Sequence, residues 1–439
     1  MISKHVTTGP LGLVLALAWC SASAGASPER SADSLTPSTA ARVALRANPD
    51  LRAAYQAIEV ARGRLVQAGL WPNPELVLGG SSDFVSTHEG EGSANAGLAQ
   101  PLPIFGRLAR ARDMGRVDVA LALAEARDFE RALIGEVQGS VVTLLALGRA
   151  IAEQERVIGA ARSLVDASAG RFRVAEVSEA DVNLLEIELA RFEQDLRLLA
   201  LERTTESLRL NRLLNRSPDA AVLVAGDLDA PTFDSAARET LMDQALQRRP
   251  DLHALRLEQD RAGAEVRLAR AETWEDWTLD AGYEYSRGVF VPPVGVKRDD
   301  LVAIGISIPL PLWNRNQGRI AAAQAEGRRA GFRVAGRERL VQQEVGTELR
   351  RADELAHVVS EYRDRIVPRA ERNVRLLEQG YREGLVGIAA LVQAEQQYAD
   401  AAIRFARTLG ELRRAEIDLE TAAAASPLLE PRITTGGTP

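Results

Sequence analysis

The chain has 439 residues with 54 basic and 61 acidic side chains, so its formal net charge is −7, and the opposite charges are interleaved with no basic block. This balance gives no electrostatic support for binding nucleic acid. A single cysteine, Cys20, excludes a framework of intrachain disulfides.

The first 24 residues are predicted to be a cleaved secretory signal. Lys4 gives a basic start, an apolar run extends from Leu11 to Trp19, and Ala22-Ser23-Ala24 forms a small-residue exit. The run is much shorter than the ~20 residues that a spanning helix needs. Cys20 leaves a second interpretation open, in which it is acylated and becomes the mature N-terminus, although bulky Trp19 stands where a small residue is expected.

Beyond the signal, the chain repeats its own landmarks in the same order. The pairs, at offsets of 201, 208 and 209 residues, are Pro49-Asp50-Leu51 with Pro250-Asp251-Leu252, Pro101-Leu102-Pro103 with Pro309-Leu310-Pro311, and Phe172-Arg173 with Tyr381-Arg382. A period near 200 is too long for a solenoid. We expect two structural halves, 40–220 and 236–425, with an irregular segment at 25–39 and a disordered tail at 426–439.

Long stretches rich in Ala, Leu, Arg and Glu predict long helices in both halves. Residues from about Leu108 to Ala167 would form a helix on the order of 90 Å long. The apolar steps of three and four from Val182 to Leu199 indicate a coiled-coil seam, and the stretch from Leu391 to Leu419 repeats it. Each half is therefore predicted to contain an antiparallel helical pair.

Four segments with a period of two predict strands, which form one β-hairpin in each half, at about 75–103 and 277–311. The second hairpin has a markedly apolar side, made of Leu279, Tyr283, Tyr285, Val302, Ile304, Ile306 and Ile308. Strands of roughly 9 to 11 residues suit a tilted crossing of a bilayer. The signal and the aromatic residues near the predicted strand ends, Tyr283, Tyr285, Phe290 and Trp313, favour lipid contact over the alternative, a small soluble β-domain. Four strands cannot close a barrel, so several chains would contribute to one.

No catalytic or metal-binding pattern stands out. His88, His253 and His357 are far apart, without the spacing of metal ligands. We therefore expect no enzyme activity and no cofactor.

These features together resemble the TolC-like outer-membrane factors, the exit ducts of tripartite efflux pumps and type I secretion systems. The duplicated Pro-Asp-Leu, the two Pro-Leu-Pro segments and the stretch from Tyr381 to Val386 carry the resemblance, which covers about Ser38 to Ala424. Within the family, the stretch from Ala68 to Leu76, with Trp71-Pro72-Asn73-Pro74 at its centre, is most similar to the branch of cobalt-zinc-cadmium and copper-silver resistance pumps.

The resemblance implies a mainly α fold with a small β part: a homotrimer whose α-barrel continues into a 12-stranded barrel in the outer membrane and extends into the periplasm of a Gram-negative bacterium. The implied partners are outer-membrane lipid, a periplasmic adaptor and an inner-membrane RND transporter. Heavy-metal cations would be the cargo. A multidrug or type I secretion duct is the alternative, and a soluble periplasmic scaffold or adaptor is the alternative of a different class.

Individual residues acquire roles through the resemblance. Tyr381, with nearby Glu383, matches the position that helps to hold the inner end closed. The helix turns that would dock the adaptor are Ala175-Glu176-Val177-Ser178 and Gly384-Leu385-Val386-Gly387.

In the best-known members of this family, two aspartates form an acidic ring at the constriction of the inner end, and this chain departs from that pattern. Ala390 and Gln393 replace its two aspartates, so Asp181, Glu176 and Glu179 of the first half are the acidic gate candidates. Asp181 and Ser178 could instead cap the helix that follows the turn.

Overall fold

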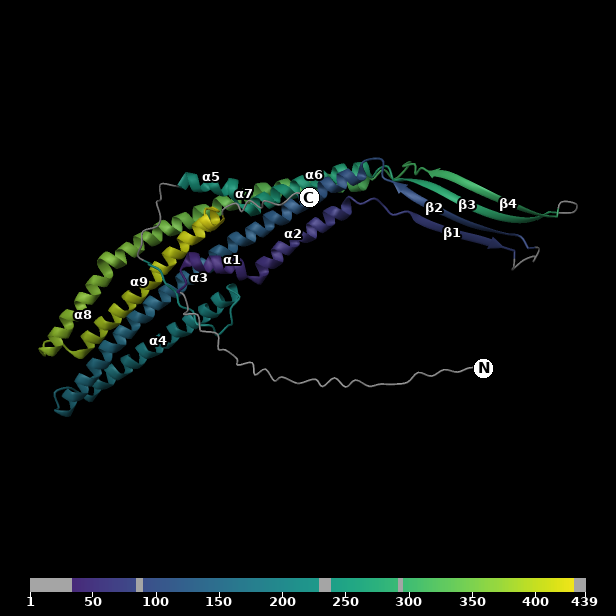
Figure 1. The fold of residues 1–439 in the computed structure, drawn as a ribbon. Helices are drawn as coiled ribbons and strands as arrows, with labels where there is room; N and C mark the ends of the chain where they lie inside the picture. The colour runs from purple at the N-terminus through teal and green to yellow at the C-terminus, as the bar shows by residue number, and fades with distance from the viewer. Residues whose placement is uncertain (1–33, 84–89, 229–237, 291–294, 430–439) are drawn as a thin grey trace, which may run out of the picture. The chain divides into compact units, whose positions relative to one another are not determined.

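A computed structural model describes residues 34–83, 90–228, 238–290 and 295–429 (Figure 1). The predicted signal, Cys20, His88 and residues 291–294 and 430–439 lie outside these ranges. Two similar halves confirm the predicted duplication. The first contains α1 (Pro37–Ala47), α2 (Pro49–Ala68), β1 (Glu75–Ser82), β2 (Gly92–Leu102), α3 (Arg107–Arg173) and α4 (Glu179–Leu213). The second contains α5 (Arg238–Arg248), α6 (Pro250–Ala271), β3 (Trp277–Phe290), β4 (Gly295–Ser307), α7 (Gln317–Glu361), α8 (Val367–Arg382) and α9 (Ile388–Ala422).

The strands form one antiparallel sheet in the order β1-β2-β3-β4, so the two hairpins lie side by side and β1 and β4 are its edges. Directly paired residues share a face. The register Leu78↔Ala96↔Tyr283↔Val302 places apolar residues of all four strands on one face. The other face carries mainly polar and small residues, as the row Glu75↔Ala99↔Asp280↔Gly305 shows, together with Val77 and Leu301.

The long helices meet along the predicted seams. Helix α3 has 67 residues and is about 100 Å long. Among the seam residues of α4, Val182, Leu185, Phe192 and Leu199 are buried. By composition, α3 contains one window apolar enough to span a membrane, but 61% of that window is buried inside the protein. The window is therefore part of the helical core.

The repeated Pro-Asp-Leu marks a joint at which the first helix of each half ends and the next begins. In the first half, Asn48 caps α2 by accepting from Leu51 N–H (2.9 Å), and its amide donates to the Leu213 carbonyl (3.0 Å) at the end of α4. In the second half, Arg249 holds the same position and donates to the Ala422 carbonyl (3.2 Å) at the end of α9. The residue before the proline thus connects the joint to the last helix of its own half.

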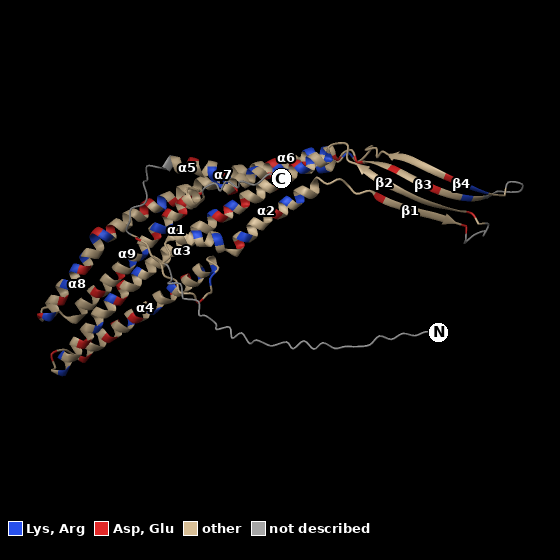
Figure 2. Ribbon diagram, viewed as in Figure 1, with Lys and Arg blue, Asp and Glu red and all other residues tan. Residues whose placement is uncertain are grey.

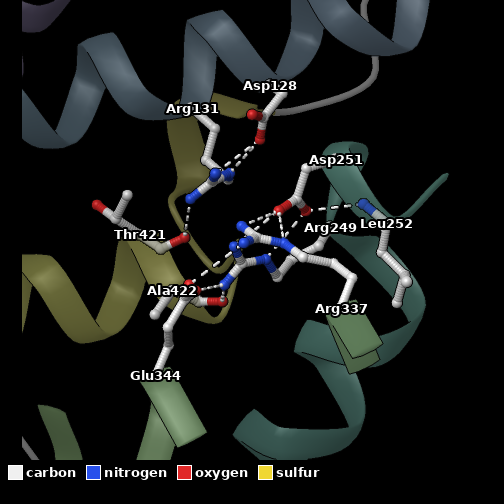
Figure 3. Close-up of polar contacts among 9 residues, drawn as sticks. All are labelled: Asp128, Arg131, Arg249, Asp251, Leu252, Arg337, Glu344, Thr421 and Ala422. Carbon is white, nitrogen blue, oxygen red and sulfur yellow. Dashed lines mark hydrogen bonds and ion pairs between the residues drawn. The ribbon is translucent and has the colours of Figure 1, made fainter. Parts of the chain in front are cut away.

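Arg249 is the buried centre of an ionic cluster that also contains the partly exposed Asp251, Arg337 and Glu344 (Figure 3). Its side chain is 1% exposed, and it donates to both Asp251 oxygens (3.0 and 2.8 Å) and to Glu344 (2.5 Å). Close by, Arg131 of α3 donates to the Thr421 carbonyl (3.0 Å). Four helices are therefore joined at the end of α9.

Some segments differ from the sequence expectation. Helix α1 begins at Pro37, inside the segment expected to be irregular, because Thr36 forms a capping box with Thr39. In the expected tail, Pro427–Leu429 form a 3-10 turn, and Leu428 and Leu429 pack on the core.

The bounds of the second hairpin also differ. Its strands have 14 and 13 residues, more than the 9 to 11 expected. Ile308 lies beyond β4, because Pro309 after it has no N–H to continue the ladder.

Candidate functional site

The candidate site is the pair of helix turns that join α3 to α4 and α8 to α9. Both turns are Schellman motifs. Glu176 N–H donates to the Arg171 carbonyl (3.0 Å), and Leu385 N–H donates to the Gly380 carbonyl (2.8 Å). The left-handed residue is Ala175 (φ 58°) in one turn and Gly384 (φ 70°) in the other. Equivalent residues of the two halves thus make the same turn.

Tyr381, the last residue but one of α8, is buried, and its side chain points toward α3 of the same chain. Its hydroxyl lies 3.1 Å from the Ser168 hydroxyl, and the Arg171 guanidinium lies 5.1 Å from its ring centre. The ring packs in a cluster with Leu185 of α4 and Leu391 of α9. Tyr381 therefore joins the α8–α9 hairpin to the α3–α4 hairpin.

Three of the four acidic gate candidates, Asp181, Glu176 and Glu383, have local partners near the turns. Asp181 forms a capping box with Ser178: it accepts from the Ser178 hydroxyl (2.8 Å) and backbone N–H (3.2 Å), while its own N–H donates to the Ser178 oxygen (3.2 Å). Glu176 pairs with Arg171 (3.1 Å), and Glu383 accepts from Gln379 (2.9 Å). Glu179 is exposed in the first turn of α4. The geometry thus gives Asp181 the capping role that the sequence left open.

Of the predicted docking residues, those at the tips of the turns are exposed. Leu385 is the most prominent, with 74% of its surface accessible. Ala175, Ser178, Gly384 and Gly387 are also exposed, whereas Val177 and Val386 are half-buried. Figure 2 shows charged residues of both signs along the helices that lead to these turns.

Glu395 is a notable residue that the sequence analysis did not single out as functional. It occupies a seam position of α9, and burial, with added repulsion from Glu378 and Glu188, raises its pKa to about 7. Glu188 is itself buried and pairs with Arg191 (3.1 Å). A charged residue at an apolar seam position was the signal that could have identified it.

This shift predicts a pH-dependent effect of Glu395→Gln. Because the folded pKa is raised, the wild type loses stability as pH rises from about 4.5 to about 7 and regains none above that. We expect the variant to be more stable than wild type by about 1–3 kcal/mol at pH 8 and unchanged at pH 4. Thermal unfolding at the two pH values measures the difference. An equal effect at both would contradict ionisation as its cause.

The face of the sheet that was predicted to meet lipid is exposed in the single chain. By register, its apolar residues are Leu76, Leu78, Leu98, Leu279, Tyr283, Val302, Ile304 and Ile306, which are 42–79% exposed. Tyr285 lies on the same face, opposite Asp300. Both tyrosines lie within β3, whereas the sequence placed them near a strand end.

Other aromatic residues gather where the strands meet the helices. Phe105, after β2, stacks on Trp274 (5.6 Å between ring centres) and meets Trp277 edge-on (6.0 Å). Trp71 precedes β1 and Trp313 follows β4, and they are 60% and 85% exposed. Aromatic residues of this kind are typical of the border between lipid tails and headgroups.

Comparison with known proteins extends these observations. The outer membrane efflux protein family matches residues 40–216 and 241–425. The cobalt-zinc-cadmium resistance protein CzcC of Cupriavidus metallidurans is 25% identical over an alignment 412 residues long, which covers 90% of this chain and 91% of CzcC.

Solved structures share the fold. CusC, whose structures concern folding and transmembrane channel formation, has a TM-score of 0.72 at 17% identity, over 89% of this chain and 92% of that one. The outer membrane protein VceC of Vibrio cholerae has a TM-score of 0.69 at 17% identity, over 88% and 95%.

Proposed function

The chain belongs to the outer membrane efflux protein family, and on that premise we propose that three copies form the exit duct of a tripartite pump for heavy-metal cations. Its location is the outer membrane, from which it extends into the periplasm. The observation that carries the proposal is the four-stranded sheet, which has an exposed apolar face and joins directly to helices as long as α3. Contact with membrane lipid requires the apolar face of the sheet, and an aqueous duct across the periplasm requires the long helices.

The edges of the sheet support a trimer. Strands β1 and β4 each lack a neighbour on one side within the described sheet, and a membrane barrel must leave no open edge. Three chains supply 12 strands, above the minimum of about eight. On the helices, Ile187, Leu198, Leu201 and Leu208 of α4 are exposed at spacings that suit packing against a neighbouring chain.

The metal cargo has two supports. The first is the similarity to CzcC, a cobalt-zinc-cadmium resistance protein. The second is the polar face of the sheet, which would line the duct: it carries Glu75, Asp280, Glu284 and Asp299 against a single basic residue, Lys297. An acidic lining attracts cations. The periplasmic adaptor would bind the helix turns, and an inner-membrane RND transporter would supply the energy, so the duct itself would catalyse nothing.

The test is to delete the gene and expose cells to cobalt, zinc, cadmium, copper and several hydrophobic drugs. We expect sensitivity to the metals, restored by the wild-type gene. Sensitivity to drugs alone would instead favour a multidrug duct. Membrane fractionation separates both from a periplasmic scaffold, which would be released from washed envelopes without detergent.

We further propose that Tyr381 holds the inner end closed. Tyr381→Phe removes the contact with Ser168, worth about 1 kcal/mol, so the open fraction should rise about fivefold. Conductance of the purified trimer in planar bilayers measures this, and Ser168→Ala should reproduce it. Tyr398→Phe is the matched control, because that hydroxyl has only a 3.4 Å contact with Arg156. If conductance is unchanged in both Tyr381→Phe and Ser168→Ala, Tyr381 does not hold the inner end closed.

A further inference from the structure

The two halves differ at one place in their long helices. In the first half, α3 runs without interruption from Arg107 to Arg173. In the second half, the π-helical turn η2 (Tyr362–Ile366) separates α7 from α8. Figure 1 shows the helix bending between its α7 and α8 parts.

The repeat offset explains why the turn is there. Before η2, the buried residues Leu133, Val137, Val141 and Leu144 of α3 correspond to Val341, Val345, Leu349 and Ala352 of α7 at an offset of 208. After η2, Ala161, Val165, Ser168 and Phe172 correspond to Ala370, Val374, Leu377 and Tyr381 at an offset of 209. The second half therefore contains one additional residue between Ala352 and Ala370, and η2 accommodates it.

One extra residue in an α-helix would rotate everything after it by about 100°. A π-turn absorbs the residue, as the bond from Val367 N–H to the Tyr362 carbonyl shows, and keeps α8 in register with its neighbours. Tyr381 can therefore still face Ser168.

The backbone ladder is locally weakened at this turn. No residue of η2 is buried, and Pro368, the second residue of α8, has no N–H with which to continue the ladder. Helix α7 is anchored by buried residues such as Val341 and Val345, whereas Tyr381, near its far end, is the only buried residue of α8.

Helix α9, which runs antiparallel to α8, has its single glycine, Gly410, near the same level. Phe405 and Leu409 pack with Tyr362 and Val367 in one cluster, which places this part of α9 beside η2. A Cβ at Gly410 would come within 2.4 Å of the Ala146 methyl, so the helix backbones are unusually close there. A glycine also lowers the resistance of α9 to bending.

We propose that η2 is the hinge on which the α8–α9 hairpin swings when the duct opens, with Tyr381 as the latch at the far end. The proposal rests on the duct function argued above. Because α3 has no such turn, the α3–α4 hairpin stays fixed and the movement belongs to the second half alone.

Hydrogen exchange on the purified trimer tests the hinge without any variant. Backbone amides of residues 362–370 should exchange at least ~tenfold faster than those of the equivalent residues 153–161 in α3. Equal protection of the two stretches would overturn the proposal.

Conductance provides the second test. Deleting Asp364, which is exposed, restores the offset of 208 and should turn α7, η2 and α8 into one continuous helix. We expect this deletion to cancel the rise in conductance, of about fivefold, that Tyr381→Phe causes. Asp364→Ala keeps the chain length and should leave that rise in conductance intact. If the deletion combined with Tyr381→Phe conducts as well as Tyr381→Phe alone, η2 is not the hinge.

These outcomes separate the hinge from the duct. If neither wild type nor Tyr381→Phe carries any current, the proposed duct function is wrong. The comparison of hydrogen exchange between residues 362–370 and 153–161 still tests whether η2 is flexible. If the deletion prevents assembly, the exchange comparison alone decides.

Discussion

Replacing Leu385 by aspartate should abolish pump-dependent resistance while the trimer still assembles. Leu385 is 74% exposed at the tip of the α8–α9 turn, where it is free to meet another protein. If the adaptor covers it, a carboxylate there would be buried without a partner. Interface residues of this kind contribute about 2 kcal/mol or more, so adaptor affinity should fall on the order of 30-fold. Growth on metal and adaptor pull-down measure the two effects.

Leu385→Met is the matched control, because it keeps an apolar side chain of similar volume and should retain resistance. Retained resistance in Leu385→Asp would show that the adaptor does not cover this turn. Loss of the trimer would make Leu385 an assembly residue instead.

Gly384 is a less suitable position for this test. Its φ of 70° means that any side chain would strain the turn, although Ala175 at φ 58° shows that the equivalent turn accepts one. A large residue at Gly384 would therefore mix strain with loss of docking.

Periodicity made the sheet predictable. Alternation over Val302, Ile304 and Ile306 fixed which residues share a face, because side chains of a strand alternate strictly. The ends of the strands were harder to predict, since pairing in β3 and β4 extends beyond the apolar alternation into polar residues such as Lys297 and Asp299.

The candidate site was only partly predictable. The two turns could be located from the repeat, but the contact of Tyr381 with Ser168 joins residues 213 positions apart, which no local pattern specifies. The difference between offsets 208 and 209 was visible in the sequence, yet whether an extra residue forms a loop, a kink or a π-turn depends on packing on both sides of it.

The partners of Arg249 could not be predicted from the sequence either, because they come from three different helices, α6, α7 and α9.

Arg249→Met is expected to cause the largest loss of stability. The substitution keeps most of the side-chain volume but removes a buried cation that donates to Asp251, Glu344 and the Ala422 carbonyl. Breaking a buried ion pair by removing one partner costs about 3–5 kcal/mol. Denaturant unfolding of the purified protein in detergent measures the change.

Two controls isolate the buried charge. Arg248→Met removes an exposed neighbour and should change stability by less than about 0.5 kcal/mol. Asn48→Ala alters the equivalent joint of the first half, where a neutral amide makes the bond to Leu213, and should cost about 1–2 kcal/mol. Equal losses for Asn48→Ala and Arg249→Met would show that the joint matters and the ionic cluster adds nothing.

The pH dependence of the same variant tests the ionic part directly. Burial alone would raise the pKa of Asp251, but hydrogen bonds and charge from Arg249 and Arg337 outweigh it and hold that pKa well below its ordinary value. A depressed folded pKa gives stability that is present above about pH 4 and is lost as pH falls further. The gap between wild type and Arg249→Met should therefore be constant from pH 5 to 8 and narrow below pH 4. A gap that stays constant into acid would mean that Arg249 acts through packing and the Ala422 carbonyl rather than through Asp251.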